Sequence, residues 1–308
     1  MSFSSDTKAE LYKQSGNARH CRIAELAAFV FFTGRITTIK DGENTKNVLY
    51  FSSEHKEVIE KCFTLLKKTF NIDNVVEMSD YELYVLSEDI TIEILKALKM
   101  FDETGFVRGN CVPSMLLKNS CCRRAFLRGC YLCAGSMSDP EKGYHLEFVC
   151  DTIENKDSII EVLRGFDIEG KFINRSKKYV VYLKDGESIA TLLNVMEAHI
   201  SLMKLENSRI VKEIKNRTNR TVNCEVANSA KTIGAASRQI ADINYLEEMM
   251  GLHNLPDDLR QMAYVRLDNP DTPLAQLGDF LSPPIGKSGV NHRLRKLSKM
   301  ADSIKGGQ

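Results

Sequence analysis

The chain of 308 residues contains one internal repeat, and this repeat restricts the folds open to it more than any other feature. Residues 20–35 read HCRIAELAAFVFFTGR, and residues 121–136 read CCRRAFLRGCYLCAGS. Both stretches have helical apolar spacing, carry Cys-Arg near the start and end near a glycine, Gly34 or Gly135, 101 positions apart. Each glycine can end its helix in the left-handed conformation. The similarity predicts two copies of one structural unit.

The same order of elements follows each of these helices. Runs of β-forming residues alternate with turn residues and with stretches of helical spacing. The predicted strands lie at 35–40, 47–53, 74–79, 81–87, 135–139, 144–150, 170–175 and 178–184. The predicted later helices lie at 54–70, 88–101, 155–166 and 186–200. We therefore expect an α+β fold, with a duplicated αββαββα domain over residues 1–205 and repeats at about 20–102 and 119–200.

Cys130 and Cys133 form a C-x-x-C pair in the second repeated helix, a spacing that redox and zinc sites use. Packing is the alternative, because two helices that cross closely need small side chains. The small residues expected at this crossing are Ala27, Ala28, Gly34, Gly129, Cys130, Cys133, Ala134 and Gly135. Zinc would need a second closely spaced Cys or His pair, and none stands at a convincing distance in the sequence. Cys121 and Cys122 lie too close in sequence for both to join the Cys130–Cys133 pair without distortion. We therefore predict packing residues, with no metal and no cofactor.

The odd cysteine count and the lack of a secretory or membrane segment point to an intracellular protein. An odd number of cysteines and a polar start argue against a secreted disulfide framework. No apolar run approaches the roughly 18 residues of a membrane helix. The net charge is +1, so a nucleic-acid surface would have to come from local clustering of charge. We expect a cytoplasmic protein whose thiols are small buried hydrophobes: Cys21, Cys62, Cys111, Cys121, Cys122, Cys130, Cys133, Cys150 and Cys224.

Residues 206–232 are predicted to link two domains. Their early part has helical spacing, and the later part is rich in Asn, Arg and Thr. Within 209–220, five basic residues oppose the single acidic Glu213: Arg209, Lys212, Lys215, Arg217 and Arg220. The segment is either a solvated connecting helix or a basic strap that contacts phosphate, since such side chains make phosphate contacts.

Residues 233–308 have the pattern of an all-helical domain. Thr272 can cap a short helix with Pro273 in its first turn and Leu274, Leu277 and Leu281 facing inward. The segment LSPPIG ends that helix, and a second helix is predicted from about 287 to 300. Two short helices joined by a turn are typical of a helix-turn-helix motif.

The second of these helices has an apolar stripe and a basic face. Val290, Leu294 and Leu297 fall on one side, and basic residues exceed acidic ones by five over 287–305. Asn and Arg can bind base edges, Ser or His can add single hydrogen bonds, and Lys with the flanking Arg suits phosphates. The alternatives are a solvated basic helix, or a metal role for His292, which has no partner near in sequence. We predict that these residues bind DNA: Lys287, Ser288, Asn291, His292, Arg293, Arg295, Lys296 and Lys299.

The duplicated unit resembles the LAGLIDADG homing endonucleases. The motif corresponds to LAAFVFFTG at 26–34 and LRGCYLCAG at 127–135. The family's metal-binding carboxylate precedes the last glycine, where this chain has Thr33 and Ala134. Neither side chain replaces a carboxylate in holding a divalent ion, so the resemblance implies a scaffold without catalytic residues. An active metal-dependent nuclease or an RNA-processing factor is the alternative, with Asp139 and Glu141 in the next turn as the acids left to it.

Three longer stretches resemble the WhiA family of sporulation and cell-division regulators. These are RAFLRGCYLCAGSMSDPEKGYHLEF, NRTNRTVNCEVANSAKT and LAQLGDFLSPPIGKSGVNHRLRKL. The resemblance implies a non-catalytic, nucleoid-associated protein that binds double-stranded DNA and acts in cell division, chromosome segregation and transcription control. A third hypothesis is a protein-interaction adaptor whose N-terminal domain binds a transcription or division protein. We expect no membrane partner.

Overall fold

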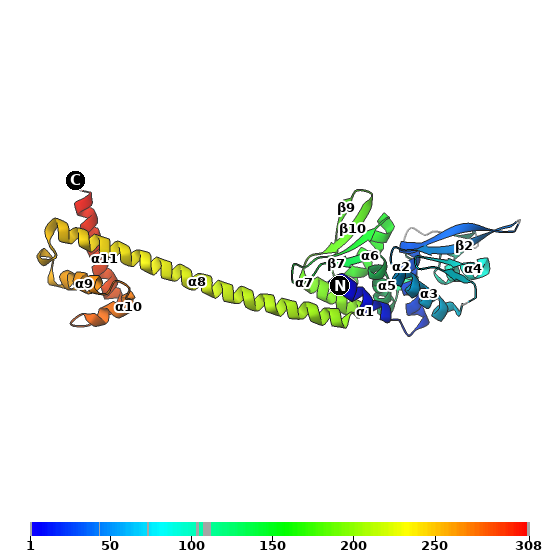
Figure 1. Ribbon diagram of the computed structural model, residues 1–308, viewed down its shortest axis with the longest axis horizontal. Helices are drawn as coiled ribbons and strands as arrows, with labels where there is room; N and C mark the ends of the chain where they lie inside the picture. The colour runs from blue at the N-terminus through cyan, green and yellow to red at the C-terminus, as the bar shows by residue number, and fades with distance from the viewer. Residues whose placement is uncertain (1, 43, 73, 103–104, 107–111, 307–308) are drawn as a thin grey trace. The chain divides into compact units, whose positions relative to one another are not determined.

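The computed structural model describes residues 2–42, 44–72, 74–102, 105–106 and 112–306, and it divides into two compact units (Figure 1). The first unit spans residues 1–212 and the second spans residues 213–308. Cys111 lies outside the described residues. The first unit is α+β and the second is all-helical, so the predicted fold class is confirmed.

The first unit contains the predicted duplication. The first copy comprises α2 (Arg19–Thr33), β1 (Gly34–Asp41), β2 (Asn44–Ser52), α3 (Lys56–Phe70), β3 (Val76–Met78), β4 (Glu82–Val85) and α4 (Glu88–Ala97). The second copy comprises α5 (Ser120–Ala134), β7 (Gly135–Met137), β8 (Leu146–Cys150), α6 (Ile153–Arg164), β9 (Lys171–Arg175), β10 (Lys178–Leu183) and α7 (Gly186–Met196). The two antiparallel sheets have equivalent strand orders, β1-β2-β4-β3 and β7-β8-β10-β9. Outside the repeats lie α1 (Phe3–Lys13), β5 (Phe101–Asp102), β6 (Gly105–Phe106) and the 3₁₀ turn η1 (Ser114–Leu117).

The glycines that end α2 and α5 are extended rather than left-handed, which corrects the expectation. Gly34 has φ −85° and ψ 143°, and Gly135 has φ −86° and ψ 147°. The chain passes directly from each helix into a strand, so no left-handed turn is needed. A Cβ on Gly34 would lie 2.7 Å from the carbonyl oxygen of Val30, and this crowding explains the glycine.

The helices α2 and α5 lie side by side at the centre of the first unit (Figure 1). A Cβ on Gly129 would lie 2.8 Å from the Cβ of Ala28 and 2.8 Å from the carbonyl oxygen of Glu25. Cys130 is fully buried and Cys133 is partly buried. The predicted close approach is therefore confirmed at Gly129 and Ala28, while Gly34 and Gly135 act at the helix ends instead.

The segment predicted as a linker lies within one long helix. The helix predicted at 186–200 ends at Met196, because Glu197 adopts a left-handed φ of 67°. The next helix, α8 (His199–Met250), has 52 residues and includes all of 206–232. The helix expected after residue 232 is the last part of α8, since the Asn, Arg and Thr side chains before it point into solvent without breaking the helix.

The second unit packs five further elements against the end of α8. These are the 3₁₀ turn η2 (Leu252–Asn254), α9 (Asp257–Asp268), α10 (Leu274–Leu277) with the 3₁₀ turn η3 (Gly278–Phe280), and α11 (Lys287–Lys305). Its core consists of buried aliphatic side chains, among them Ile243, Leu246, Leu259, Met262, Leu277, Leu281, Val290, Leu294, Leu297 and Ala301. Thr272 does not cap α10 as expected: Pro273 is the N-cap, and the carbonyl of Thr272 instead accepts a hydrogen bond from Arg266 Nη1 at 2.8 Å.

Not every thiol is buried, which corrects another expectation. Five of the eight described cysteines are buried, Cys133 is intermediate, and Cys121 and Cys224 are exposed. In the described part of the chain, no helix is both long enough and apolar enough to cross a membrane.

Candidate nucleic-acid interface

The α10–η3 segment and α11 are joined by a tight turn. The backbone N–H of Ile285 donates to the carbonyl oxygen of Gly278 at 3.2 Å. A Cβ on Gly278 would overlap the carbonyl oxygen of Ile285, so only glycine fits at this position. The turn therefore fixes the direction in which α11 begins relative to the α10–η3 segment.

The apolar stripe of α11 faces the core of the second unit. Val290, Leu294 and Leu297 are at most 1% exposed, as their spacing predicted. At the other end of the helix, Lys305 Nζ lies 2.8 Å from Asp242 Oδ1 on α8. Because one side of α11 is held inward, the opposite side is presented to solvent.

The residues predicted to bind DNA divide into two groups by exposure. Six are exposed: Lys287, Ser288, His292, Arg295, Lys296 and Lys299. Asn291 and Arg293 are partly buried. Ser288, Asn291, Arg295 and Lys299 follow helical spacing along one face, so α11 brings them together.

Arg293 already has a partner within the unit. Its Nη1 donates to the carbonyl oxygen of Asp258 at 3.4 Å, and its Nε lies 3.9 Å from Asp258 Oδ2. These contacts hold α11 against the start of α9, a role that the spacing within one helix does not reveal. Among the described residues, the one cluster of potential metal ligands does not include His292.

The basic residues predicted as a strap are spread along α8. Arg209 Nη1 donates to Glu206 Oε1 at 2.7 Å. Lys212 Nζ donates to the carbonyl oxygen of Pro140 at 2.6 Å and lies 4.6 Å from the ring centre of Tyr144. The remaining three, Lys215, Arg217 and Arg220, are exposed. The solvated-helix interpretation fits this segment, and three cations remain free to meet a phosphate backbone.

The ends of α2 and α5 carry no acidic side chain at the LAGLIDADG positions. Thr33 Oγ1 donates to the carbonyl oxygen of Phe29 at 2.7 Å, so this hydroxyl is used within its own helix. Ala134 has only a methyl group. In the following turn, Asp139 Oδ1 accepts the backbone N–H of Glu141 at 2.9 Å, which is the usual role of aspartate in a turn.

A buried ion-pair network between α2 and α5 escaped the sequence analysis. Glu25 is fully buried; its Oε1 lies 3.4 Å from Lys61 Nζ and its Oε2 lies 3.0 Å from Arg128 Nη2. Arg128 also contacts Glu197 at 3.0 Å. Burial alone would lower the pKa of Arg128, but the carboxylates of Glu25 and Glu197 outweigh it and raise that pKa. The available signal was a glutamate within the apolar run of residues 23–32.

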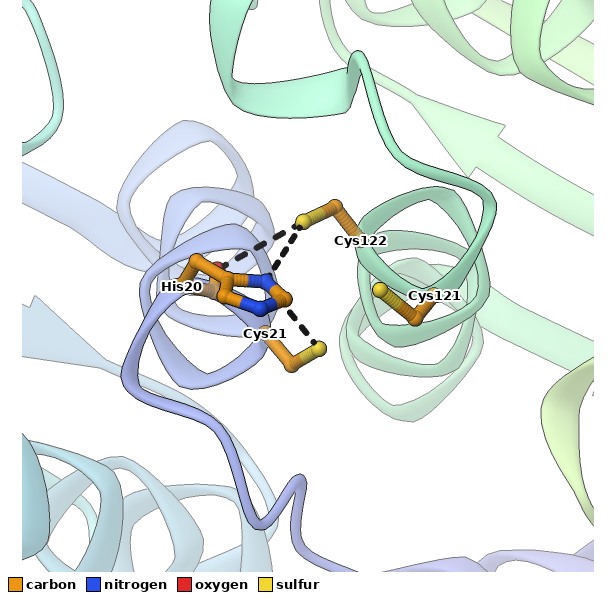
Figure 2. A group of neighbouring side chains, drawn as sticks. All are labelled: His20, Cys21, Cys121 and Cys122. Carbon is orange, nitrogen blue, oxygen red and sulfur yellow. Dashed lines mark hydrogen bonds between the residues drawn. The ribbon is translucent and has the colours of Figure 1, made fainter.

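A second group that the sequence analysis missed lies at the N-terminal ends of α2 and α5. His20 and Cys21 in the first turn of α2 meet Cys121 and Cys122 in the first turn of α5 (Figure 2). Their ligand atoms all lie within 4.8 Å of one another. Spacing along one segment did not reveal this group, because packing brings together residues that are 101 positions apart.

These features define a class of protein: a duplicated LAGLIDADG-like domain followed by a helix-turn-helix domain. The family models agree, since the WhiA LAGLIDADG-like domain matches residues 123–215 and the WhiA C-terminal HTH domain matches residues 218–301.

Two curated relatives match over nearly their whole length. The "Probable cell division protein WhiA" of Lachnoclostridium phytofermentans is 45% identical, over 99% of this chain and 100% of its own. Its namesake in Alkaliphilus oremlandii is 42% identical, over 100% of this chain and 99% of its own. The crystal structure of full-length DUF199/WhiA from Thermatoga maritima superposes with a TM-score of 0.54 at 25% identity, covering 98% of this chain and 99% of that one. The chain belongs to the WhiA family.

Proposed function

We propose that this chain is a DNA-binding regulator of cell division that uses α11 to recognise double-stranded DNA. The proposal depends on one observation above all. The buried stripe of Val290, Leu294 and Leu297 turns a polar, basic face of the same helix toward solvent. The helix-turn-helix family match and the names of the relatives support it.

Each side chain on this face has a role that its chemistry suits. Asn291 and Arg295 can bind adenine and guanine edges through paired hydrogen bonds. Ser288 and His292 add single hydrogen bonds to bases. The remaining cations contact phosphates: Lys287, Arg293, Lys296 and Lys299. Arg293 reaches a phosphate only by loosening its contact with Asp258, a partly exposed ion pair at 3.9 Å that contributes about 1 kcal/mol or less.

The LAGLIDADG-like unit acts in this proposal without cutting nucleic acid. Phosphodiester cleavage by such a fold needs oxygen ligands for a hard divalent cation at the helix ends. Thr33 and Ala134 occupy those ends, and the Thr33 hydroxyl already donates a hydrogen bond to the carbonyl oxygen of Phe29. We extend the proposal to chromosome segregation and sporulation-type transcription control, at the nucleoid in the cytoplasm. The first unit would bind a transcription or division protein.

Duplex binding measured against salt tests the proposal. The variant Lys296→Gln/Lys299→Gln removes two exposed cations, so the slope of log affinity against log salt should fall by about 1.8, or about 0.9 per phosphate contact. Arg260→Gln is the matched control, since Arg260 lies on α9 and pairs with Asp257. An unchanged slope in the double variant would exclude α11 as the DNA-binding helix.

The nuclease alternative has its own assay. Plasmid DNA and RNA are incubated with the full-length chain and Mg²⁺ or Mn²⁺. We expect no site-specific cleavage. Specific cleavage that Asp139→Asn abolishes would establish the metal-dependent nuclease or RNA-processing activity in place of the non-catalytic role.

A further inference from the structure

The starts of α2 and α5 bring one nitrogen ligand and three sulfur ligands together. His20 Nδ1 lies 3.2 Å from Cys122 Sγ and 3.4 Å from Cys21 Sγ. Figure 2 shows the imidazole and the three thiols converging between the two helix ends. Cys21 and Cys122 are 8% and 3% exposed, while His20 and Cys121 reach solvent. The group is thus anchored on its inner side and open to an ion on its outer side.

This geometry is close to what a tetrahedral zinc ion requires. Zn–S bonds of about 2.3 Å and Zn–N bonds of about 2.0 Å place tetrahedral ligands roughly 3.5–3.8 Å apart. The two nitrogen–sulfur distances are already slightly shorter than that, and no ligand pair exceeds 4.8 Å. Zinc binding leaves the remaining difference to rotamer changes at His20 and Cys121, whose side chains are exposed and can turn.

The duplication explains how such a group arises. His20 and Cys121 are 101 positions apart, as are Cys21 and Cys122, and so are the glycines that end the two helices. Each copy therefore contributes an equivalent pair of adjacent ligands from its first turn. Counting about 1.5 Å per residue from Cys21 to Gly34, this group lies roughly 20 Å from the position where a LAGLIDADG nuclease binds its metal.

The net charge of the zinc-bound group suits the two helix ends that hold it. Three thiolates and a neutral imidazole around Zn²⁺ carry a net charge of −1. Two helix N-termini, each with the positive end of its dipole, point at this charge.

We propose that His20, Cys21, Cys121 and Cys122 bind one Zn²⁺ ion that ties together the first turns of the two central helices. All four protein ligands are supplied, so the site is of the closed, structural type. The ion replaces the thiol protons, which pass to solvent, and no electrons are transferred. This site is separate from DNA binding by α11 and does not depend on it.

Cobalt and zinc titrations of the full-length chain test this proposal. The protein carries no histidine tag, is kept reduced with a phosphine, is freed of metal with a chelator, and is then titrated with Co²⁺ and Zn²⁺. We expect one equivalent of Co²⁺ to give the intense d–d absorption of a tetrahedral site with thiolate charge-transfer bands. One equivalent of Zn²⁺ should then remove these bands.

Variants assign the ligands. Cys121→Ser and His20→Gln change exposed side chains, so the fold should survive, and each should weaken Zn²⁺ binding by more than the roughly 10–100-fold lost with an outer-sphere partner. Cys224→Ser, an exposed cysteine on α8, and Cys133→Ser, in the C-x-x-C pair, are the controls and should leave affinity unchanged. Absence of the tetrahedral spectrum would overturn the proposal, as would a spectrum lost in Cys133→Ser but kept in Cys121→Ser. An intact mass two hydrogens lighter before reduction, with no metal bound after it, would show a disulfide instead.

Discussion

Replacing Gly129 with alanine measures how closely α2 and α5 must approach each other. The new Cβ would lie 2.8 Å from the Cβ of Ala28 and 2.8 Å from the backbone oxygen of Glu25, closer than real Cβ contacts allow. Overpacking of this kind costs about 1–3 kcal/mol. Alanine also favours the helix over glycine by about 1 kcal/mol. We therefore expect a net loss of roughly 0–2 kcal/mol in the free energy of unfolding of the first unit.

The variant Gly234→Ala separates the cost of overpacking from the gain in helix propensity. Gly234 lies inside α8, and a Cβ there would meet nothing within 4 Å. Its replacement should therefore show only the helix gain, about 1 kcal/mol of stabilisation. The two variants should differ by about 1–3 kcal/mol. Each kcal/mol shifts the melting temperature by about 2–4 °C for the first unit and by about 4–8 °C for the smaller second unit, in which Gly234 lies.

Urea and thermal unfolding followed by circular dichroism and calorimetry provide the measurement, because calorimetry separates the transitions of the two units. The double variant Ala28→Gly/Gly129→Ala removes one of the two clashes. Its stability should exceed the sum of the single effects. If Gly129→Ala stabilises its unit as much as Gly234→Ala does, the helices are not in close contact at Gly129 and the packing argument fails.

Three further predictions concern other contacts in the two units. Arg128→Met should destabilise the first unit by about 3 kcal/mol, because it leaves the buried carboxylate of Glu25 without its main partner. Adding Glu25→Gln should recover part of this loss in the same unfolding assay. Gly278→Ala should abolish duplex binding measured by fluorescence anisotropy, because the turn before α11 has no room for a Cβ; full affinity would contradict the motif geometry. Brief alkylation followed by mass spectrometry should label the exposed Cys224 at once and Cys62 only after unfolding, since burial raises the pKa of the Cys62 thiol well above its usual value; rapid labelling of Cys62 would refute its burial.

Local patterns predicted the repeated elements of the first unit, although not α1, β5 or β6. The repeat and the alternation of strand and helix spacing predicted both copies of the αββαββα unit, because hydrophobic period reports directly on secondary structure. The same holds for the inward stripe of α11, where three apolar residues at helical spacing face the core. The residues proposed to bind DNA remain a prediction from that pattern.

Features that depend on backbone continuity were harder to predict. A polar, Asn-rich stretch resembles a linker by composition, and residues 206–232 nonetheless form part of a helix of 52 residues. The glycines at the ends of α2 and α5 suggested left-handed caps, whereas strands begin there directly. Composition does not determine whether a helix continues through the next residue or ends before it.

The sequence by itself determined the order of elements, the duplication and the loss of the acidic residues at Thr33 and Ala134, since each can be observed within one short segment. Only the tertiary structure decided which distant residues meet. It buried Glu25 against Arg128 and brought His20 within 3.2 Å of Cys122. Such contacts depend on how closely two helices cross and on which turns face each other, and spacing along one segment carries no information about either.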